Sequence, residues 1–313
     1  MRALAALIVL VLAVTGAAAT DKTVVSLGTA TPGGGFPLYG GAVAEVVNAE
    51  DPSLAVTPRN TKGSTENVPL LEAGTLDLAL VQGEVAHEAL AGIGRAPANL
   101  RIVAAMYSTP GMFVVRADAP YRTIDDLRDK PVAFGAQGSG LVILARYVLD
   151  GLGLDRDRDF KAVFLERAGD GPAMVLDGRV AALWGGGIGW PGFTTMANAP
   201  GGARFLVPDA AGISRVLARH PFLRPLDVPA GSYPGQTAVI TSVGSWSFIM
   251  ARPSLPDETA YRIARALHRG EAKLAAKLAQ ARETTAANTA AAARAELLHP
   301  GVARYLREIG ALR

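Results

Sequence analysis

A short apolar strand, a glycine-rich turn and a helix follow one another at three places in this chain, and this pattern constrains the fold most. The turns cover residues 32–35, 60–67 and 137–140, and the last of them leads into an apolar helix over residues 141–149. A helix leaves its first backbone N–H groups without partners, and its dipole favours negative charge at that end. The three turns together predict a pocket that grips a small anion from both sides.

The rest of the chain alternates between strands and apolar helical segments, which predicts an α/β fold with mainly parallel sheets. A length of 313 residues favours two lobes. Residues 71–80 and 175–184 have a similar pattern, in which a helix end is followed by a glycine and a buried strand. This weak internal similarity fits two lobes, although any helix-to-strand turn can have the same pattern. Strands are expected near residues 23–28, 54–59, 76–81, 101–106, 112–116, 131–135, 162–165, 180–184, 204–207 and 245–251.

Helix positions are indicated by capping patterns and by composition. Residues 123–126 and 254–257 both fit a capping box, and the second is followed by a helical face of Ala260, Ile263, Ala264 and Leu267. The alanine-rich region 272–298 is predicted to be helical and to pack on the outside of a lobe, with docking to a partner as the alternative.

The start of the chain has the features of a cleaved export signal. Residues 1–19 comprise a cationic start, an apolar run of about twelve residues and a small-residue exit, whereas a membrane-spanning helix needs ~20. The sequence has no cysteine, which excludes disulfides, thiolate chemistry and a lipid-anchored thiol. We therefore expect a free periplasmic protein.

Composition and motifs argue against nucleic-acid binding and catalysis. Loss of residues 1–19 lowers the formal charge from +3 to +2, and the basic residues form no stripe. The four histidines are far apart, and no HExxH, GxSxG or GK[ST] motif occurs, so we expect no metal and no cofactor. Ser64 and Ser139 could be nucleophiles only with a neighbouring base, and helix-capping hydroxyls that contact a ligand are the simpler interpretation.

Several motifs, taken in order, resemble the TAXI family, the extracytoplasmic solute-binding subunits of TRAP transporters. The resemblance covers the chain beyond residue 20 and depends on GGGFP at 33–37, TKGSTEN at 61–67, LVQ at 80–82, AFGAQGSG at 133–140, GSYPGQ at 231–236 and HPGVARYLRE at 299–308. The chain departs from the family pattern at Phe36, Lys62 and Leu141, where tyrosine, glycine and threonine are usual.

The resemblance implies a type II periplasmic binding protein fold with two lobes and an interlobe cleft. The first lobe would comprise residues 20–115 and 211–313, and the second residues 116–210. The cleft would close on a small carboxylate, a glutamate-like amino acid or a dicarboxylate, for delivery to an ion-driven membrane permease. Residues expected to line it, including four aromatic residues beside glycine-rich turns, are Gly34, Phe36, Tyr39, Thr61, Lys62, Gly63, Ser64, Asn67, Gln82, Gly138, Ser139, Gly140, Trp184 and Tyr233.

Two other functions remain open at this point. The chain could serve a different transporter or a sensor, or it could be a secreted transferase on the same fold. A large permease encoded beside it would favour the TRAP assignment, whereas a catalytic carboxylate or a cofactor-binding lysine inside the cleft would favour the transferase.

Overall fold

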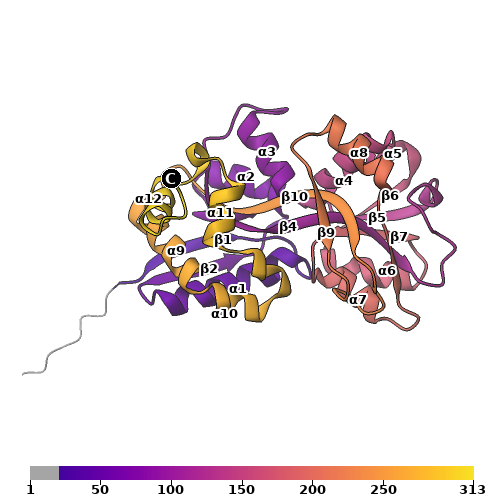
Figure 1. Ribbon diagram of the computed structural model, residues 1–313, viewed down its shortest axis with the longest axis horizontal. Coiled ribbons are helices and arrows are strands. Elements are labelled where there is room, and N and C mark those ends of the chain that lie inside the picture. The colour runs from indigo at the N-terminus through magenta and orange to yellow at the C-terminus, as the bar shows by residue number, and fades with distance from the viewer. Residues whose placement is uncertain (1–20) are drawn as a thin grey trace, which may run out of the picture.

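The computed structural model describes residues 21–313, so the predicted signal at residues 1–19 lies outside the described part of the chain. Two lobes lie side by side along the long axis of the molecule, one built from both ends of the chain and the other from its middle (Figure 1). Among residues 21–313 no helix is both long enough and apolar enough to cross a membrane.

The first lobe contains the N-terminal strands and the C-terminal helices. Its elements are β1 (Thr23–Gly28), α1 (Gly35–Glu50), β2 (Leu54–Arg59), α2 (Ser64–Glu72), β3 (Leu78–Val81), α3 (Gly83–Ala91), α9 (Asp257–Arg269), α10 (Glu271–Lys277), α11 (Ala286–Ala292) and α12 (Pro300–Glu308). Two short 3₁₀ turns, η3 (Ala279–Glu283) and η4 (Ala295–Leu297), also belong to this lobe, whereas a third, η1 (Asp125–Leu127), belongs to the second lobe.

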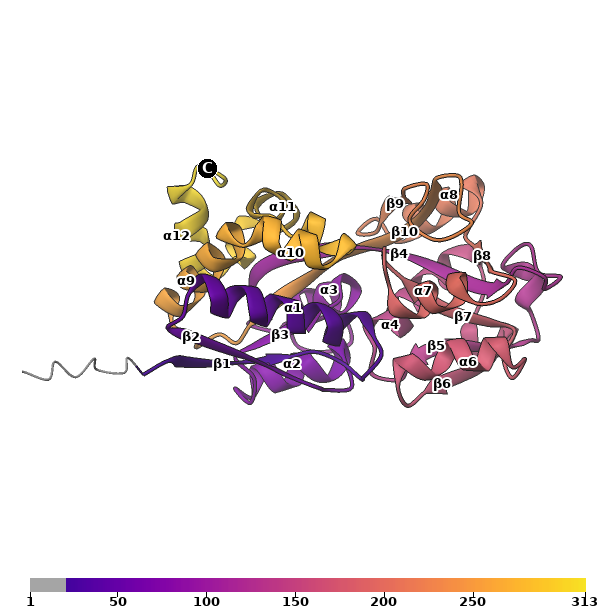
Figure 2. The ribbon, with the colours of Figure 1, turned by 90° about the horizontal axis from the view of Figure 1, so that it is seen from below.

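The second lobe contains the middle elements, and two long strands connect the lobes. Its elements are β5 (Pro131–Ala136), α4 (Gly140–Leu152), α5 (Arg156–Asp159), β6 (Lys161–Leu165), η2 (Ala168–Asp170), α6 (Gly171–Leu176), β7 (Ala182–Gly186), α7 (Pro191–Asn198), β8 (Ala203–Leu206), α8 (Ala210–Arg219) and β9 (Arg224–Val228). The connecting strands are β4 (Arg101–Arg116) and β10 (Ile240–Ala251), which pass from one lobe into the other (Figure 2).

The strands follow the path β2-β1-β3-β10-β4-β7-β5-β6 through both lobes. Each lobe contributes a parallel triplet, β2-β1-β3 in the first and β6-β5-β7 in the second. The connecting strands pair antiparallel with each other and with these triplets, and β8 and β9 add antiparallel pairs. The predicted α/β architecture with parallel strands in two lobes is confirmed.

Two strand predictions need correction. The strands expected at 101–106 and 112–116 are a single strand, β4, because its ladder with β10 runs through Ser108, Thr109 and Pro110. Strand β9 was not predicted; its second residue is a proline, and its only partner is β10.

The side chains form two separate hydrophobic cores, and their membership corrects the predicted lobe boundaries. Met112 and Val115 already belong to the second core, as do Val216, Val228 and Val243, whereas Ile249–Ala251 belong to the first. The second lobe therefore begins slightly before residue 116 and extends to about residue 243. The chain returns to the first lobe along β10 and not at residue 211, because α8 packs on α4.

The capping predictions differ in outcome. Asp126 accepts the N–H of Thr123 at 2.9 Å, and Thr123 Oγ1 accepts the N–H of Asp126 at 3.3 Å, so this capping box forms, although only η1 follows. Helix α9 begins at Asp257 after Pro256, which makes no side-chain cap bond, so the predicted box at 254–257 is wrong. The predicted apolar face of α9 is buried as expected.

The alanine-rich region is helical in pieces and covers a free edge of β4. Helix α10 ends before the extended residue Leu278, and Thr285 caps α11. Thr289 Oγ1 accepts the N–H of Ala105 at 3.0 Å, Thr284 Oγ1 donates to the carbonyl of Met106 at 2.7 Å, and Glu283 accepts the N–H of Ser108 at 2.5 Å. These side chains satisfy backbone groups that a neighbouring strand would otherwise pair.

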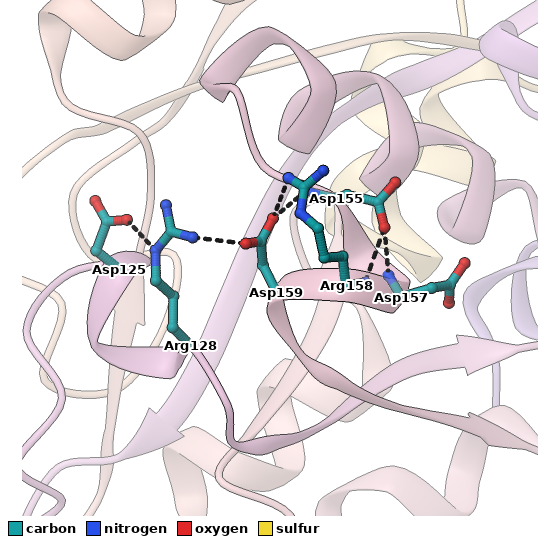
Figure 3. Close-up of polar contacts among 6 residues, drawn as sticks. All are labelled: Asp125, Arg128, Asp155, Asp157, Arg158 and Asp159. Carbon is teal, nitrogen blue, oxygen red and sulfur yellow. Dashed lines mark hydrogen bonds and ion pairs between the residues drawn. The ribbon is translucent and has the colours of Figure 1, made fainter.

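A surface cluster of acidic and basic side chains stabilises a turn of the second lobe (Figure 3). Asp155 accepts the N–H groups of Asp157 and Arg158, each at 2.9 Å, and so caps α5. Arg128 bridges Asp125 at 3.0 Å and Asp159 at 2.7 Å. Among the described residues no group of three or more histidine, cysteine, aspartate or glutamate side chains could hold a metal ion.

Candidate functional site

A cavity of about 40 Å³ lies between the two lobes, at the carboxyl ends of their parallel strands. The first lobe and the adjoining part of β4 contribute Ala30, Thr31, Gly34, Gly35, Phe36, Gly63, Ser64, Gln82, Tyr107 and Thr109. The second lobe contributes Ala136, Ser139, Gly140, Leu141, Ala168, Gly186 and Trp190. All three glycine-rich turns identified in the sequence therefore reach the same cavity.

Several helices begin at the cavity wall. Helices α1, α2 and α4 start at or directly beside lining residues, Gln82 is the N-cap of α3, and Trp190 is the N-cap of α7. The partial positive charges of these helix ends face one small volume from both lobes. The arrangement favours an anion without any cationic side chain.

Three hydroxyl groups in the wall are fixed as acceptors by backbone N–H groups. Ser64 Oγ accepts the N–H of Gln82 at 3.0 Å, Ser139 Oγ accepts that of Leu141 at 3.2 Å, and Thr31 Oγ1 accepts that of Ala168 at 3.2 Å. A hydroxyl that already accepts a bond still has its own proton to donate. All three protons are therefore available to an acceptor inside the cavity.

The side-chain amide of Gln82 lies in the wall beside these hydroxyls. Gln82 is 3% exposed, and its Nε2 has no hydrogen-bond partner within the described structure. A buried donor without a partner costs about 1–3 kcal/mol. The Gln82 side chain also lowers the pKa of the neighbouring Glu84, so its amide N–H lies close to that carboxyl, while its Oε1 would lie 3.0 Å from a Cβ on Gly140.

A buried carboxyl, Glu84, lies behind Gln82 and outside the cavity wall. Its Oε1 accepts a hydrogen bond from Ser245 Oγ at 2.7 Å. Burial raises the pKa of Glu84 to about 7, and the neighbouring Ser245 and Gln82 side chains lower the pKa by smaller amounts. Ser245 belongs to β10, so Glu84 contacts one of the two strands that connect the lobes.

No aspartate, glutamate, lysine, arginine or histidine lines the cavity in the part of the chain that the structure describes. Lys62, predicted to reach the solute, is exposed, and its backbone N–H donates to Glu66 at 2.6 Å. Its side chain instead marks the outer edge of the cleft, because a Cβ on Gly138 would lie 2.7 Å from Lys62 Cβ. Gly138 likewise contacts the opposite lobe and does not line the cavity.

The lobes touch at this outer edge, so the conformation is closed. The carbonyl of Gly138 accepts bonds from the N–H of Thr65 at 3.3 Å and from Thr65 Oγ1 at 3.0 Å. Gly169 donates its N–H to the carbonyl of Pro32 at 3.4 Å. Gly33 has φ +80°, and a Cβ there would lie 2.5 Å from the Cα of Gly169, so both the backbone conformation and the contact require glycine.

A second set of contacts joins the lobes beside α3. Glu88 forms an ion pair with Arg146 and accepts a hydrogen bond from Tyr147 at 2.8 Å. The ring of His87 stacks on Phe222 with centroids 4.0 Å apart. Closure therefore brings together groups on both sides of the connecting strands.

Half of the predicted site residues line the cavity, and the rest have other partners. Those in the wall are Gly34, Phe36, Gly63, Ser64, Gln82, Ser139 and Gly140. Tyr39 is fully buried and shares a hydrogen bond of 2.9 Å with Thr284. Thr61 donates to the carbonyl of Thr29 at 3.1 Å, and Asn67 donates to the same carbonyl at 2.9 Å, so both hold the second turn in place.

The two aromatic residues predicted in the second lobe lie outside the wall. Trp184 is fully buried in the core and donates its indole N–H to the carbonyl of Leu141 at 2.8 Å. Tyr233 donates its hydroxyl to the carbonyl of Gly187 at 2.7 Å. Each supports a segment that does line the cavity, one at the start of α4 and one beside Trp190.

The prediction missed several residues of the wall. Trp190 could have been found, because it follows the glycine-rich run 185–189 and directly precedes a helix that begins at Pro191. Tyr107 and Thr109 lie within β4 and carry no such signal. They reach the cavity only because β4 crosses between the lobes.

Comparison with solved structures identifies the fold. The malate-bound MatC protein of Rhodopseudomonas palustris is 15% identical, with a TM-score of 0.57 over 91% of this chain and 96% of that one. A substrate-binding protein of an amino acid ABC transporter is 15% identical, with a TM-score of 0.51 over 82% of this chain and 98% of that one. These similarities show the two-lobed periplasmic binding protein fold. The sequence model of the NMT1-like family matches residues 27–310, and the protein therefore belongs to the NMT1-like family.

Proposed function

We propose that this protein is a periplasmic solute-binding protein that captures a small carboxylate between its lobes and presents it to a membrane permease. The observation that carries the proposal is the convergence of helix N-termini and free hydroxyl protons, from both lobes, on one cavity. A carboxylate offers several lone pairs to such a set of donors.

Closure would be the central step of the mechanism. A solute that contacts Ser64 in one lobe and Ser139 in the other binds the closed state better than the open state, and shifts the population toward it. The contacts of Gly138 with Thr65 and of Gly169 with Pro32 would then form at the edge of the cleft. A permease could distinguish the closed protein from the open one by its shape.

The partner we propose is a TRAP-type permease, with the chain as a member of the TAXI group. The support is the ordered set of motifs, above all residues 33–37, 133–140 and 299–308. The solved neighbours named above carry the titles of an amino acid ABC transporter and of a malate complex, so a different transporter is the second candidate. The predicted signal at residues 1–19 supports a periplasmic location.

The proposal can be tested with the chain from residue 20 onward and a thermal-shift screen of small carboxylates, each paired with its uncharged amide, for example butyrate with butyramide. We expect the melting temperature to rise with carboxylates only, since a ligand at a hundred times its Kd stabilises by about 2.7 kcal/mol. Equal shifts with the amides, or no shift with any carboxylate, would contradict the proposal. Co-purification with a permease encoded nearby would then separate the two transporter candidates.

A further inference from the structure

The wall of the cavity contains donors of hydrogen bonds and no charged side chain, and this composition restricts the solute further. Building on the proposed function, we infer that the solute carries a single carboxylate and no other formal charge, with a compact apolar body. Neither a dicarboxylate nor an amino acid meets that description.

The carboxylate has a defined place in the wall. The hydroxyl protons of Ser64 and Ser139 are free, and the buried side-chain amide of Gln82 lies beside them. A Cβ on Gly140 would lie 2.5 Å from Gln82 Cβ and 2.9 Å from Ser64 Oγ, so these groups are close together across the cleft. One carboxylate can accept from several of these donors at once.

A second carboxylate would have no charged partner. Lys62 is exposed and outside the wall, and among the described residues no other lysine or arginine lines the cavity. Moving a second unpaired charge from water into this enclosed volume carries a large desolvation cost that neutral donors, already used by the first carboxylate, would not offset.

An ammonium group would also be unpaired. Two buried carboxyl groups lie on segments that adjoin lining residues. Glu84 accepts a hydrogen bond from Ser245 through Oε1 only, and its Oε2 has no partner among the described residues; Glu283 accepts from the N–H and hydroxyl of Ser108. Neither belongs to the cavity wall. An amino acid would therefore lose the hydration of its ammonium group without gaining an ion pair.

The remaining wall is apolar. Phe36, Leu141 and Trp190 face the same volume as Ala136 and Ala168. Burial of hydrocarbon against these side chains favours an apolar body, whereas a polar one would lose bonds to water. The small volume of the closed cavity, about 40 Å³, further favours a short chain.

Matched triplets of solutes test the inference by calorimetry on the chain from residue 20 onward. The members of each triplet share a carbon count; the amino acid adds an ammonium group to the monocarboxylate, and the diacid has a second carboxylate in place of the terminal methyl group. The triplets are propionate, alanine and malonate; butyrate, 2-aminobutyrate and succinate; valerate, norvaline and glutarate. We expect the monocarboxylate to bind at least tenfold more tightly than its partners in the triplet that fits best. Tightest binding by a dicarboxylate or an amino acid would overturn this inference and leave carboxylate binding intact. Binding by no member of any triplet would overturn both.

A variant with an added cation provides a second test. Phe36 lines the cavity in the first turn of α1, whereas Leu38, two residues on, is 47% exposed and outside the wall. Phe36→Arg should shift the succinate-to-butyrate affinity ratio toward succinate by tenfold or more, and Leu38→Arg should leave that ratio unchanged. The inference that the lack of a cation in the wall sets the specificity would be contradicted by either of two results. One is an unchanged affinity ratio in a folded Phe36→Arg variant, and the other is an equal shift of the ratio in both variants.

Discussion

The two lobes share one plan but face the cavity with different chemistry. The first lobe contributes Thr31, Ser64 and Gln82, whereas the second contributes mainly Leu141 and Trp190, with Ser139 as its main hydroxyl. The first lobe therefore supplies more of the hydrogen-bonding side chains, while apolar contacts come from both lobes through Phe36, Leu141 and Trp190. Similar strand and helix order therefore does not make the halves of the cleft equivalent.

The cores of the lobes differ in a related way. In the second lobe, aromatic rings contact one another in series, with centroid distances of 4.7 Å between Phe113 and Trp184 and 5.9 Å between Phe113 and Phe134. The first core is mostly aliphatic, with Tyr39–Tyr107 and Tyr261–Tyr305 as its close tyrosine pairs. The second lobe thus depends more on a few large side chains.

The largest effect should come from Trp184→Ala, which empties the centre of the second core. We expect a loss of about 3–5 kcal/mol in the free energy of unfolding, as for other buried aromatic residues. Leu71→Ala, in the first core, is the matched control and should cost about 2–5 kcal/mol. Urea denaturation measures both. If Trp184→Ala weakened solute binding without lowering stability, the residue would be a ligand contact after all.

The next effect concerns Glu84, whose carboxyl is fully buried in the first lobe. Its pKa is about 7 when folded and near 4.5 when unfolded. Below pH 4.5 both states are protonated; as the pH rises toward 7 the unfolded state ionises first, so stability falls. The wild-type protein should lose up to about 3 kcal/mol by pH 8 through this group.

Glu84→Gln should remove this component of the pH dependence while keeping a partner for Ser245. Denaturation at pH 5 and pH 8 measures the difference, and Glu45→Gln, at an exposed site of the same lobe, serves as the control. Parallel pH profiles for the wild type and Glu84→Gln would show that the carboxyl is already ionised in the folded state.

A third experiment compares the two hydroxyls that face each other across the cleft. Ser64→Ala and Ser139→Ala should each weaken carboxylate binding by about 1.5–3 kcal/mol, the range for hydrogen bonds to charged groups. The fold should survive, because loss of an N-cap costs about 1 kcal/mol. Calorimetry would show whether the lobes contribute equally. Unchanged affinity in both variants would place the carboxylate elsewhere.

Gly138→Ala tests closure without touching the cavity wall. The added methyl group would meet Lys62 Cβ at 2.7 Å only when the lobes are closed. Overpacking of this kind costs about 1–3 kcal/mol, and here the cost should appear as weaker binding, with little change in unfolding of the free protein. Gly41→Ala, where a Cβ meets nothing within 4 Å, is the control. Equal affinity of Gly138→Ala and wild type would mean that binding does not require this contact.

The smallest effect is expected for Lys62→Ala. Because the side chain is exposed and outside the wall, affinity for monocarboxylates and dicarboxylates alike should change by less than about 0.5 kcal/mol. A selective loss of dicarboxylate binding would restore Lys62 to the site and would weaken the contrast between a polar first lobe and an apolar second lobe.

Local patterns in the sequence predicted the strand, turn and helix units well, because each unit is specified by neighbouring residues. These patterns gave wrong predictions where contacts with segments distant in the sequence determine the local structure. Pro110 and Gly111 read as a break, yet β4 continues through them because β10 pairs with Pro110 and β7 with Gly111. Ser254 fits a capping box but accepts a hydrogen bond from Arg252 instead of capping α9.

The same limit applies to the site. The glycine-rich turns identified Ser64 and Ser139, but whether a neighbouring side chain points into the cavity depends on packing between the lobes. Asn67 and Lys62 belong to the same turn as Ser64, yet Asn67 donates a hydrogen bond to the backbone and Lys62 is exposed to solvent. Tyr107 and Thr109 depend on the path of β4 and have no local signature.

The order in which residues enter the two cores has a consequence for how the chain can fold as it is synthesised. The second core is complete once Val243 has emerged, whereas the first needs Tyr305 and Leu306 near the C-terminus. Until residues 283–289 arrive, the edge of β4 at Ala105 and Ser108 also lacks its hydrogen-bond partners. The lobe made first is thus finished last, and a chain released early would expose an unpaired strand that invites aggregation.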